Sequence, residues 1–423
     1  MAKIDFLYGR DSLALDIPDE RLEATLVSRA HAYQAKAGEE ELVRLALEKP
    51  IGSPRLSELA RGRDNIVILA SDHTRPVPSR IIFPAMIEEI RRGNPKAVVT
   101  VLISTGCHRA TTRAELENKF GPGTLDGFKV AIHDCDESAV TKIGRLPSGA
   151  ELLLNKLAVE ADLLVAEGFI EPHFFAGFSG GRKSVFPGVT NRSSVMANHC
   201  SEFIAHPLAR TGFLDNNPIH ADMVAAAGQA KLAFIVNVVL GSAQKVIKAF
   251  AGHYDQAHRA GADFLAGLAG VKAAPADIVI TTNGGYPLDQ NLYQAVKGLT
   301  AAEATVKPGG IIIMAARGED GHGGESFWRT FKEEKNLEAM MAAFMARRPD
   351  ETIADQWQSQ ILARVLLKAK VIMVTQAPTE MVNDLHMLTA PTLAEALKMA
   401  DEILGHKRGR ITAIPDGIGV IVR

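Results

Sequence analysis

The feature that most constrains the fold is a series of short, almost continuously apolar runs that alternate with amphipathic helical patterns along most of the chain. Such runs are typical of strands whose two faces are both covered by helices. We therefore predict an α/β protein with two Rossmann-like domains, mostly parallel sheets and an active-site cleft between the domains. The predicted strands are 65–70, 97–104, 129–132, 162–166, 232–239, 278–282, 310–315 and 370–375, and the predicted helices are 79–92, 110–120, 193–204, 289–299, 337–346, 353–367 and 393–404.

A domain boundary is predicted at the small-residue stretch Gly270–Pro275, because a new strand pattern begins directly after it. We expect an N-terminal α/β domain over residues 1–272 and a C-terminal α/β domain over residues 273–423, both of ordinary size for domains. The last extended runs, 410–414 and 418–422, are compatible with a return to either domain.

Charge and composition exclude several classes of protein. The 423 residues include 47 Lys and Arg against 49 Asp and Glu, so no excess of positive charge exists to neutralise a nucleic-acid backbone. No apolar run approaches the roughly 18 residues that a membrane span needs. The start of the chain lacks an apolar signal region, and three cysteines make no disulfide framework. We expect a cytoplasmic protein with no nucleic-acid or membrane partner.

Polar side chains gather directly after four successive predicted strands. In open α/β sheets, ligands bind beyond the carboxyl ends of the strands. One strand end with His, Asp, Arg or Cys means little, but four in a row indicate a single shared crevice. The four segments are 71–78, 105–109, 133–137 and 167–184.

The glycine-rich segment 177–184 superficially resembles a phosphate-binding loop of nucleotide hydrolases. That motif needs glycine where Arg182 stands, and a second candidate, 121–127, is one residue too long for the dinucleotide fingerprint. Neither ATP hydrolysis nor ordinary NAD binding is supported. The glycines still permit close approach of a ligand to backbone. Lys183, just beyond them, could be a charge clamp or a covalent attachment point.

A possible metal ligand follows this loop. His199 lies in a predicted helix that Ser193 or Ser194 would cap. Cys107 and Cys200 each neighbour a histidine, which makes a zinc site conceivable. No paired Cys-x-x-Cys spacing supports zinc, however.

The helix predicted over 289–299 contributes from the second domain. Lys297 lies four residues after Tyr293 and three after Gln294, so these three share the side away from its apolar stripe and could face the cleft. Trp357 shares helical spacing with nearby isoleucines, which favours core packing for it.

Taken singly, His108, His173 and His199 are also explained as hydrogen-bonded or packed histidines. Taken together with their neighbours, they resemble the lactate racemase family, whose members use a nickel-pincer nucleotide. The resemblance covers nearly the whole chain in family order, and its long segment 171–184 is the most specific. Its motifs are Asp72-His-Thr-Arg-Pro, Gly106-Cys-His-Arg, Glu171-Pro-His-Phe-Phe-Ala-Gly-Phe-Ser-Gly-Gly-Arg-Lys-Ser, Asn198-His199, Asp289-Gln-Asn-Leu-Tyr-Gln-Ala-Val-Lys-Gly298 and Asp355-Gln-Trp-Gln.

The resemblance implies a role for each motif. Lys183 matches the lysine that carries the Ni(II)-pyridinium-3,5-bisthiocarboxylate mononucleotide through a thioamide, and His199 matches the protein ligand to nickel. His108 and His173 match two catalytic acid/bases. The further cofactor contacts implied are Asp72, His73, Thr74, Arg75, Gln294 and Lys297, and the substrate contacts implied are Arg75, Lys297, Tyr293 and Trp357.

The chemistry of racemisation explains why such an enzyme needs a cofactor, nickel and histidines. Removing a hydride from C2 of a 2-hydroxy acid leaves a stable 2-oxo acid, but no side chain accepts a hydride, so a cofactor must. Sulfur donors in a square plane suit nickel. Histidine, with an ordinary pKa of ~6.5, suits transfer of the hydroxyl proton.

We expect a racemase or epimerase of 2-hydroxy acids, with proteins of cofactor biosynthesis as partners. The acid itself is not fixed by the sequence. The alternatives are a zinc hydrolase or lyase that uses the same histidines, and a non-catalytic member that only binds the nucleotide.

Overall fold

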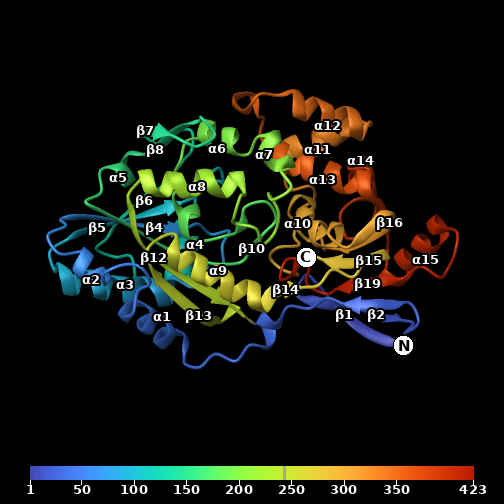
Figure 1. Cartoon of the computed structure of the whole chain (residues 1–423), viewed down its shortest axis with the longest axis horizontal. Coiled ribbons are helices and arrows are strands. Elements are labelled where there is room, and N and C mark those ends of the chain that lie inside the picture. Colours follow the sequence, from blue (N-terminus) through green and yellow to red (C-terminus); the bar gives the residue numbers. More distant parts are fainter. Residues whose placement is uncertain (242–243) are drawn as a thin grey trace.

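The computed structural model describes residues 1–241 and 244–423 and contains two six-stranded sheets (Figure 1). The predicted α/β class is confirmed, since all neighbouring strands in these sheets are parallel except the edge pair at 232–240 and 246–252. In spatial order, the first sheet comprises β13 (Val246–Gly252), β12 (Leu232–Leu240), β9 (Leu163–Phe169), β4 (Asn65–Ser71), β5 (Val98–Ser104) and β6 (Lys129–Ile132). The second comprises β18 (Leu388–Ala390), β17 (Lys370–Val374), β16 (Val306–Ala315), β15 (Ala276–Thr282), β19 (Ile411–Ile414) and β3 (Leu22–Thr25).

Burial on both faces explains the continuous apolar runs. In β4, Val67 and Leu69 pack into one core cluster, and Ile66 and Ile68 pack into another on the opposite face. Period-two geometry sends successive side chains to opposite faces, so a strand with two dry faces needs apolar residues at every position.

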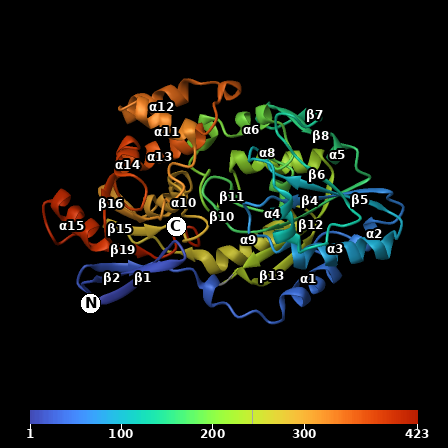
Figure 2. The same cartoon turned by 180° about the vertical axis from the view of Figure 1, so that it is seen from behind.

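Helices cover both faces of each sheet (Figure 2). The first sheet is covered by α1–α3 on one face and by α8 and α9 on the other, and the second by α10 and α13 on one face and by α15 on the other. Their bounds are α1 (Glu39–Glu48), α2 (Leu56–Leu59), α3 (Ser79–Gly93), α4 (Arg113–Phe120), α5 (Lys156–Val159), α6 (Arg192–Asn198), α7 (Ser201–Ala205), α8 (Pro218–Gln229), α9 (Gln256–Ala269), α10 (Leu292–Glu303), α11 (Glu325–Glu333), α12 (Leu337–Ala346), α13 (Gln356–Lys368), α14 (Thr379–Asp384) and α15 (Leu393–Leu404).

The first 25 residues lie with the second sheet. The sequence pattern places them in the first domain, whereas the hairpin of β1 (Ala2–Tyr8) and β2 (Asp11–Ile17) packs its apolar face on the second sheet. β3 pairs with β19 in that sheet. The reason is tertiary pairing with a strand at the far end of the chain, which no local pattern reveals. The boundary near residue 272 stays a prediction.

The two extended runs near the C-terminus belong to different sheets. Residues 411–414 form β19 in the second sheet, between β15 and the edge strand β3. β20 (Ile421–Val422) instead pairs with β14 (Gly270–Val271), and Ile421 packs in a cluster with residues of the first half such as Phe178.

The helix predicted over 193–204 is two helices, α6 and α7. Asn191, not a serine, caps α6, because its side chain accepts the backbone N–H of Ser193. Cys200 is extended, with φ −67° and ψ 160°, which breaks the helix after His199. His199 therefore stands at the end of a helix rather than inside one.

Short strands outside the two sheets give no clear sequence signal. They are β7 (Val140–Arg145), β8 (Glu151–Asn155), β10 (Pro172–His173) and β11 (Gly177–Phe178). The two-residue pair β10–β11 matters most, since it carries His173 opposite Gly177.

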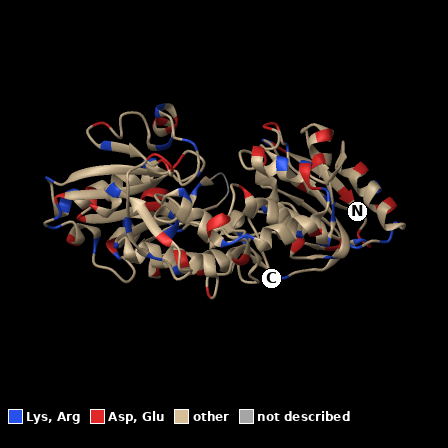
Figure 3. Ribbon diagram, turned by 90° about the horizontal axis from the view of Figure 1, so that it is seen from above, with Lys and Arg blue, Asp and Glu red and all other residues tan. Residues whose placement is uncertain are grey.

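Charged residues of both signs are spread over both halves of the molecule (Figure 3). Among the helices formed by the described part of the chain, none has the length and apolar character needed to cross a membrane.

The close approach of α10 to the second sheet is testable at Gly298. A Cβ there would lie 2.3 Å from the carbonyl oxygen of Thr282. We expect Gly298→Ala to lower Tm by about 2–10 °C, because overpacking costs ~1–3 kcal/mol. A Cβ at Gly267 in α9 would have no atom within 4 Å, so Gly267→Ala should leave Tm equal or slightly higher. Equal melting curves for the two variants would contradict this packing.

Candidate active site

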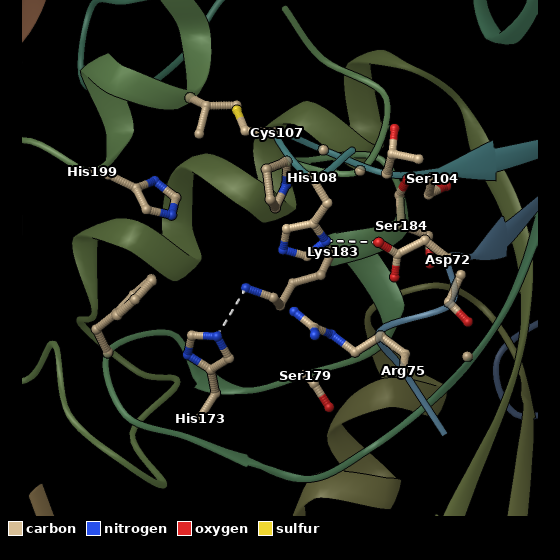
Figure 4. Close-up of a pocket in the computed structure, with 18 of the residues that line it drawn as sticks. Asp72, Arg75, Ser104, Cys107, His108, His173, Ser179, Lys183, Ser184 and His199 are labelled. Atoms are coloured by element: carbon tan, nitrogen blue, oxygen red, sulfur yellow. Dashed lines mark hydrogen bonds and ion pairs between the residues drawn. The ribbon is translucent and has the colours of Figure 1, made fainter. Parts of the chain in front are cut away.

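A cavity of about 500 Å³ lies where the carboxyl ends of β4, β5 and β9 face α10 and the start of α13. Figure 4 shows its side chains converging from segments far apart in the sequence. Of the four strand-end segments expected to share a crevice, 71–78, 105–109 and 167–184 line this cavity, and 133–137 does not. The predicted site residues that line it are Asp72, Arg75, His108, His173, Lys183, His199, Tyr293, Gln294, Lys297 and Trp357.

Asp72 and His108 form a directed pair after β4 and β5. The Asp72 Oδ2 lies 2.7 Å from the His108 Nδ1, and Asp72 is 2% exposed. Burial would raise the pKa of Asp72, but the hydrogen bond and charge of His108, helped by Arg75, hold that pKa well below its usual value. An ionised carboxylate only accepts hydrogen bonds, so His108 carries its proton on Nδ1 and is left with Nε2 for a ligand.

His173 is oriented by the β10–β11 pair and by aromatic rings. The Ala176 amide donates to its Nδ1 at 3.3 Å, and its Nε2 lies 3.5 Å from the Lys183 Nζ. The ring stacks on Phe174 and meets the edge of Phe175. Burial and then the charge of Lys183 lower the pKa of His173 well below its usual value. The free imidazole is therefore neutral.

Lys183 is carried by a tight glycine loop. Gly180 and Gly181 have φ values of 78° and 54°, which favour glycine, and the Asn237 side chain accepts the Gly181 N–H at 2.7 Å. Burial lowers the pKa of Lys183 far below 10.5, and the neighbouring cations Arg182 and Arg75 lower it further. A neutral amine in this position is a nucleophile.

His199 stands between two aromatic rings on the other side of the cavity. Its ring centroid lies 5.1 Å from that of Phe175 and 5.0 Å from that of Trp357. Burial, and then Lys183, lowers the pKa of His199 to about 3. Its Nδ1 is buried and has no hydrogen-bond partner among the described residues. A neutral imidazole of this kind can act as a metal ligand.

The second half of the chain closes the cavity. Burial, and then Arg75, lowers the pKa of Lys297 to about 8. The Tyr293 hydroxyl donates to the Asp355 Oδ1 at 3.2 Å, which places its ring on the cavity wall. With Arg75 on the opposite side, the cavity presents cationic groups from both halves and suits an anionic ligand.

Two predicted residues do not line the cavity. His73 points away, with its Nδ1 3.1 Å from the Thr111 hydroxyl. The Thr74 hydroxyl donates to Asp72 at 2.7 Å and accepts from Arg75 at 3.0 Å. It therefore orients two lining residues without lining the cavity itself. Cofactor contact by either stays a prediction.

Two residues next to the site, the buried Glu167 and the partly buried Lys119, were not predicted from the sequence. Glu167 is fully buried in the cavity wall and accepts the Ser79 hydroxyl at 2.6 Å. Its position at the end of β9 is a strand-end signal that could have found it. Lys119 donates to the backbone oxygens of Arg75 at 3.0 Å and Val77 at 3.4 Å. On the sequence it is an ordinary helix-surface lysine, so no local signal marks it.

The thiols give the zinc alternative no support. Cys107 lines the cavity, and burial raises the pKa of its thiol to about 12. Among the described residues, the group of three close potential ligands is Asp134, Cys135 and Asp136, which lies outside the cavity.

Comparisons with known proteins agree along the whole chain. Residues 8–212 match the family model of the lactate racemase N-terminal domain, and residues 271–422 match that of the lactate racemase C-terminal domain. Proteins named lactate racemase from Thermoanaerobacterium thermosaccharolyticum and Lactiplantibacillus plantarum are 56% and 49% identical to it, each over 100% of both chains.

Comparison with solved structures also finds a lactate racemase. The lactate racemase apoprotein of Thermoanaerobacterium thermosaccharolyticum superposes with a TM-score of 0.96 at 55% identity, over 100% of both chains. A Thermotoga maritima protein shares the fold, with a TM-score of 0.68 at 17% identity over 92% of this chain and 100% of its own.

The lowered pKa of Lys183 predicts unusual reactivity at pH 7. We expect Lys183 to be acylated by a small amine-directed reagent faster than the exposed Lys129. Peptide mass spectrometry of briefly treated protein measures this, and Lys183→Arg serves as the blank for the peptide. Labelling of Lys129 ahead of Lys183 would show that the amine is charged or inaccessible.

Proposed function

Because the chain belongs to the lactate racemase family and is thus an isomerase, we propose that it interconverts the enantiomers of lactate or a closely related 2-hydroxy acid. We propose further that it works with a nickel-pincer nucleotide attached to Lys183. The observation that carries the proposal is the convergence of His108, His173 and Lys183, whose pKa burial lowers, on one cavity with cationic walls.

The donor groups of the cavity fit such a cofactor. Lys183 offers an uncharged amine for a thioamide bond, and His199 offers an imidazole whose Nδ1 has no protein partner in the described chain. A volume of about 500 Å³ suits a mononucleotide together with a small acid. When bound, the group supplies an acceptor for the hydride from C2 of the substrate.

The two histidines handle the proton. One removes the hydroxyl proton as the hydride leaves, and the other donates a proton to the oxygen when the hydride returns to the opposite face. Asp72 keeps His108 in the tautomer that offers Nε2. The histidine that acts as the base must start neutral, as the lowered pKa of His173 favours, and the histidine that donates must start protonated.

Arg75 and Lys297 hold the substrate. Their positive charges match the carboxylate and the oxygen on C2, and interactions in a water-poor site are stronger than at the surface. Tyr293 and Trp357 form the wall beside them and limit access of water.

The expected partners are the small acid and the proteins that build and deliver the nucleotide. We also propose a cytoplasmic location, because Cys107, Cys135 and Cys200 are all free thiols and such thiols persist in a reducing compartment.

Racemisation by the cofactor-loaded protein is the direct test. We expect polarimetry to show loss of optical activity for lactate in a panel of 2-hydroxy acids. His108→Asn and His173→Asn should each lower kcat by ~10²–10⁴-fold, because each removes one acid/base. His406→Asn, at an exposed site remote from the cavity, is the control and should keep full activity. An inert loaded protein would contradict the proposal.

The pKa of Lys297 predicts a pH dependence of substrate binding. Below about pH 8 the ammonium is charged, and above it the amine is neutral. We therefore expect KM for the acid to rise as the pH climbs through about 8. Lys297→Arg, which stays charged, should have a flat KM over the same range, measured by initial rates. A flat wild-type profile would mean that Lys297 does not bind the carboxylate.

A further inference from the structure

The two-histidine chemistry leaves the enzyme in a different protonation state after each turnover. This point rests on the proposed function. The imidazole that took the hydroxyl proton is left protonated, and the one that gave a proton is left neutral. Before the next turnover in the same direction, one proton must leave the first histidine and one must return to the second. No electrons move in this step, and water is the only proton source and sink required.

The two histidines differ in their access to water. The His108 side chain is 43% exposed, so it can exchange its proton with solvent directly. His173 is enclosed by Phe174, Phe175 and Lys183 on the side of the main cavity. A ligand that fills this cavity closes that side further, so His173 needs another path.

A second cavity, of about 30 Å³, lies against His173. His173, Phe174 and Lys297 line both cavities, so these side chains form the wall between them. A water needs roughly 10–15 Å³ and two to four polar partners, and this cavity meets both conditions. Its polar lining residues are Glu171, His173, Thr211, Lys297 and Thr300.

Glu171 is the titratable carboxyl of this second cavity. It lies two residues before His173 in an extended segment, so the two side chains leave the backbone on the same side. Two hydrogen bonds of 2.9 Å fix its backbone, one from its N–H to the Ser179 hydroxyl and one from the Ser179 N–H to its carbonyl. Glu171 is partly exposed and lines the second cavity.

The surroundings of Glu171 allow it to carry a proton. Burial raises its pKa above the usual value, and the nearby cations, Lys297 first, only partly offset this effect. A carboxyl whose pKa moves toward neutrality exchanges protons efficiently in both directions.

We propose that Glu171, through water in the second cavity, exchanges the proton of His173 with solvent between turnovers. When His173 has taken the substrate proton, that proton passes to water and then to the Glu171 carboxylate, which releases it to bulk. For the opposite enantiomer, the same path runs in reverse. Glu171 does not touch the substrate, so it is a proton-exchange residue and not an acid/base of the chemical step.

The variant Glu171→Gln tests the proposal, because slower proton exchange affects kcat but not kcat/KM. The exchange follows product release, so its slowing lowers kcat but leaves kcat/KM unchanged. For the loaded enzyme at saturating acid we expect kcat and KM to fall together by about tenfold or more. Added formate, a carboxylic acid small enough for the second cavity, should restore kcat in proportion to its concentration.

Controls separate this role from a structural one. Glu171→Asp keeps a carboxyl and should retain most of kcat, and Glu160→Gln removes an exposed carboxylate outside both cavities and should change nothing. An unchanged kcat in Glu171→Gln would overturn the proposal while racemisation itself stood. A parallel fall of kcat and kcat/KM without rescue by formate would mean that Glu171 only positions His173. A wild type that racemises no acid would overturn both the function and the exchange path.

Discussion

The mutual repulsion of cations in a buried cavity is the constraint on which the site depends. Arg75, Lys183 and Lys297 lie close enough that each lowers the pKa of a neighbour, and burial adds to the effect. Such a cluster is unfavourable unless an amine gives up its proton or an anion enters. Both responses serve the proposed chemistry, because a neutral Lys183 can form a covalent bond and a negative acid finds its charge matched.

Hydrogen bonds to the surrounding backbone hold these cationic side chains together despite their mutual repulsion. Arg182 is 1% exposed and donates to the carbonyl of Ala176 at 2.8 Å and to that of Gly180 at 3.2 Å. Its guanidinium thus fixes both ends of the loop that carries Lys183. Lys119 does the same for the backbone at Arg75. Removing such a cation is costly, since the backbone oxygens would lose a charge-assisted hydrogen bond.

Local pattern predicted most of the fold, because the strands and helices obey simple periodicities. The strand at 129–132 and the helices at 337–346 and 393–404 have the predicted bounds. The strand-end rule also found the segments of Asp72 and His108. It could not find the break that puts His199 at a helix end, since that break lies in the extended backbone of Cys200, which no local pattern marks. The pairing of β3 and the role of Lys119 likewise depend on contacts distant in sequence.

The path of the chain between the two sheets has a consequence for synthesis. β3 is made near the beginning, yet its partner β19 is made near the end. As the polypeptide leaves the ribosome, the first sheet can assemble from consecutive segments, but the second cannot be completed until the final residues emerge. The nascent hairpin of β1 and β2 therefore keeps its apolar face unpaired until the strands of the second sheet are made, and that face is open to non-native contacts in the meantime.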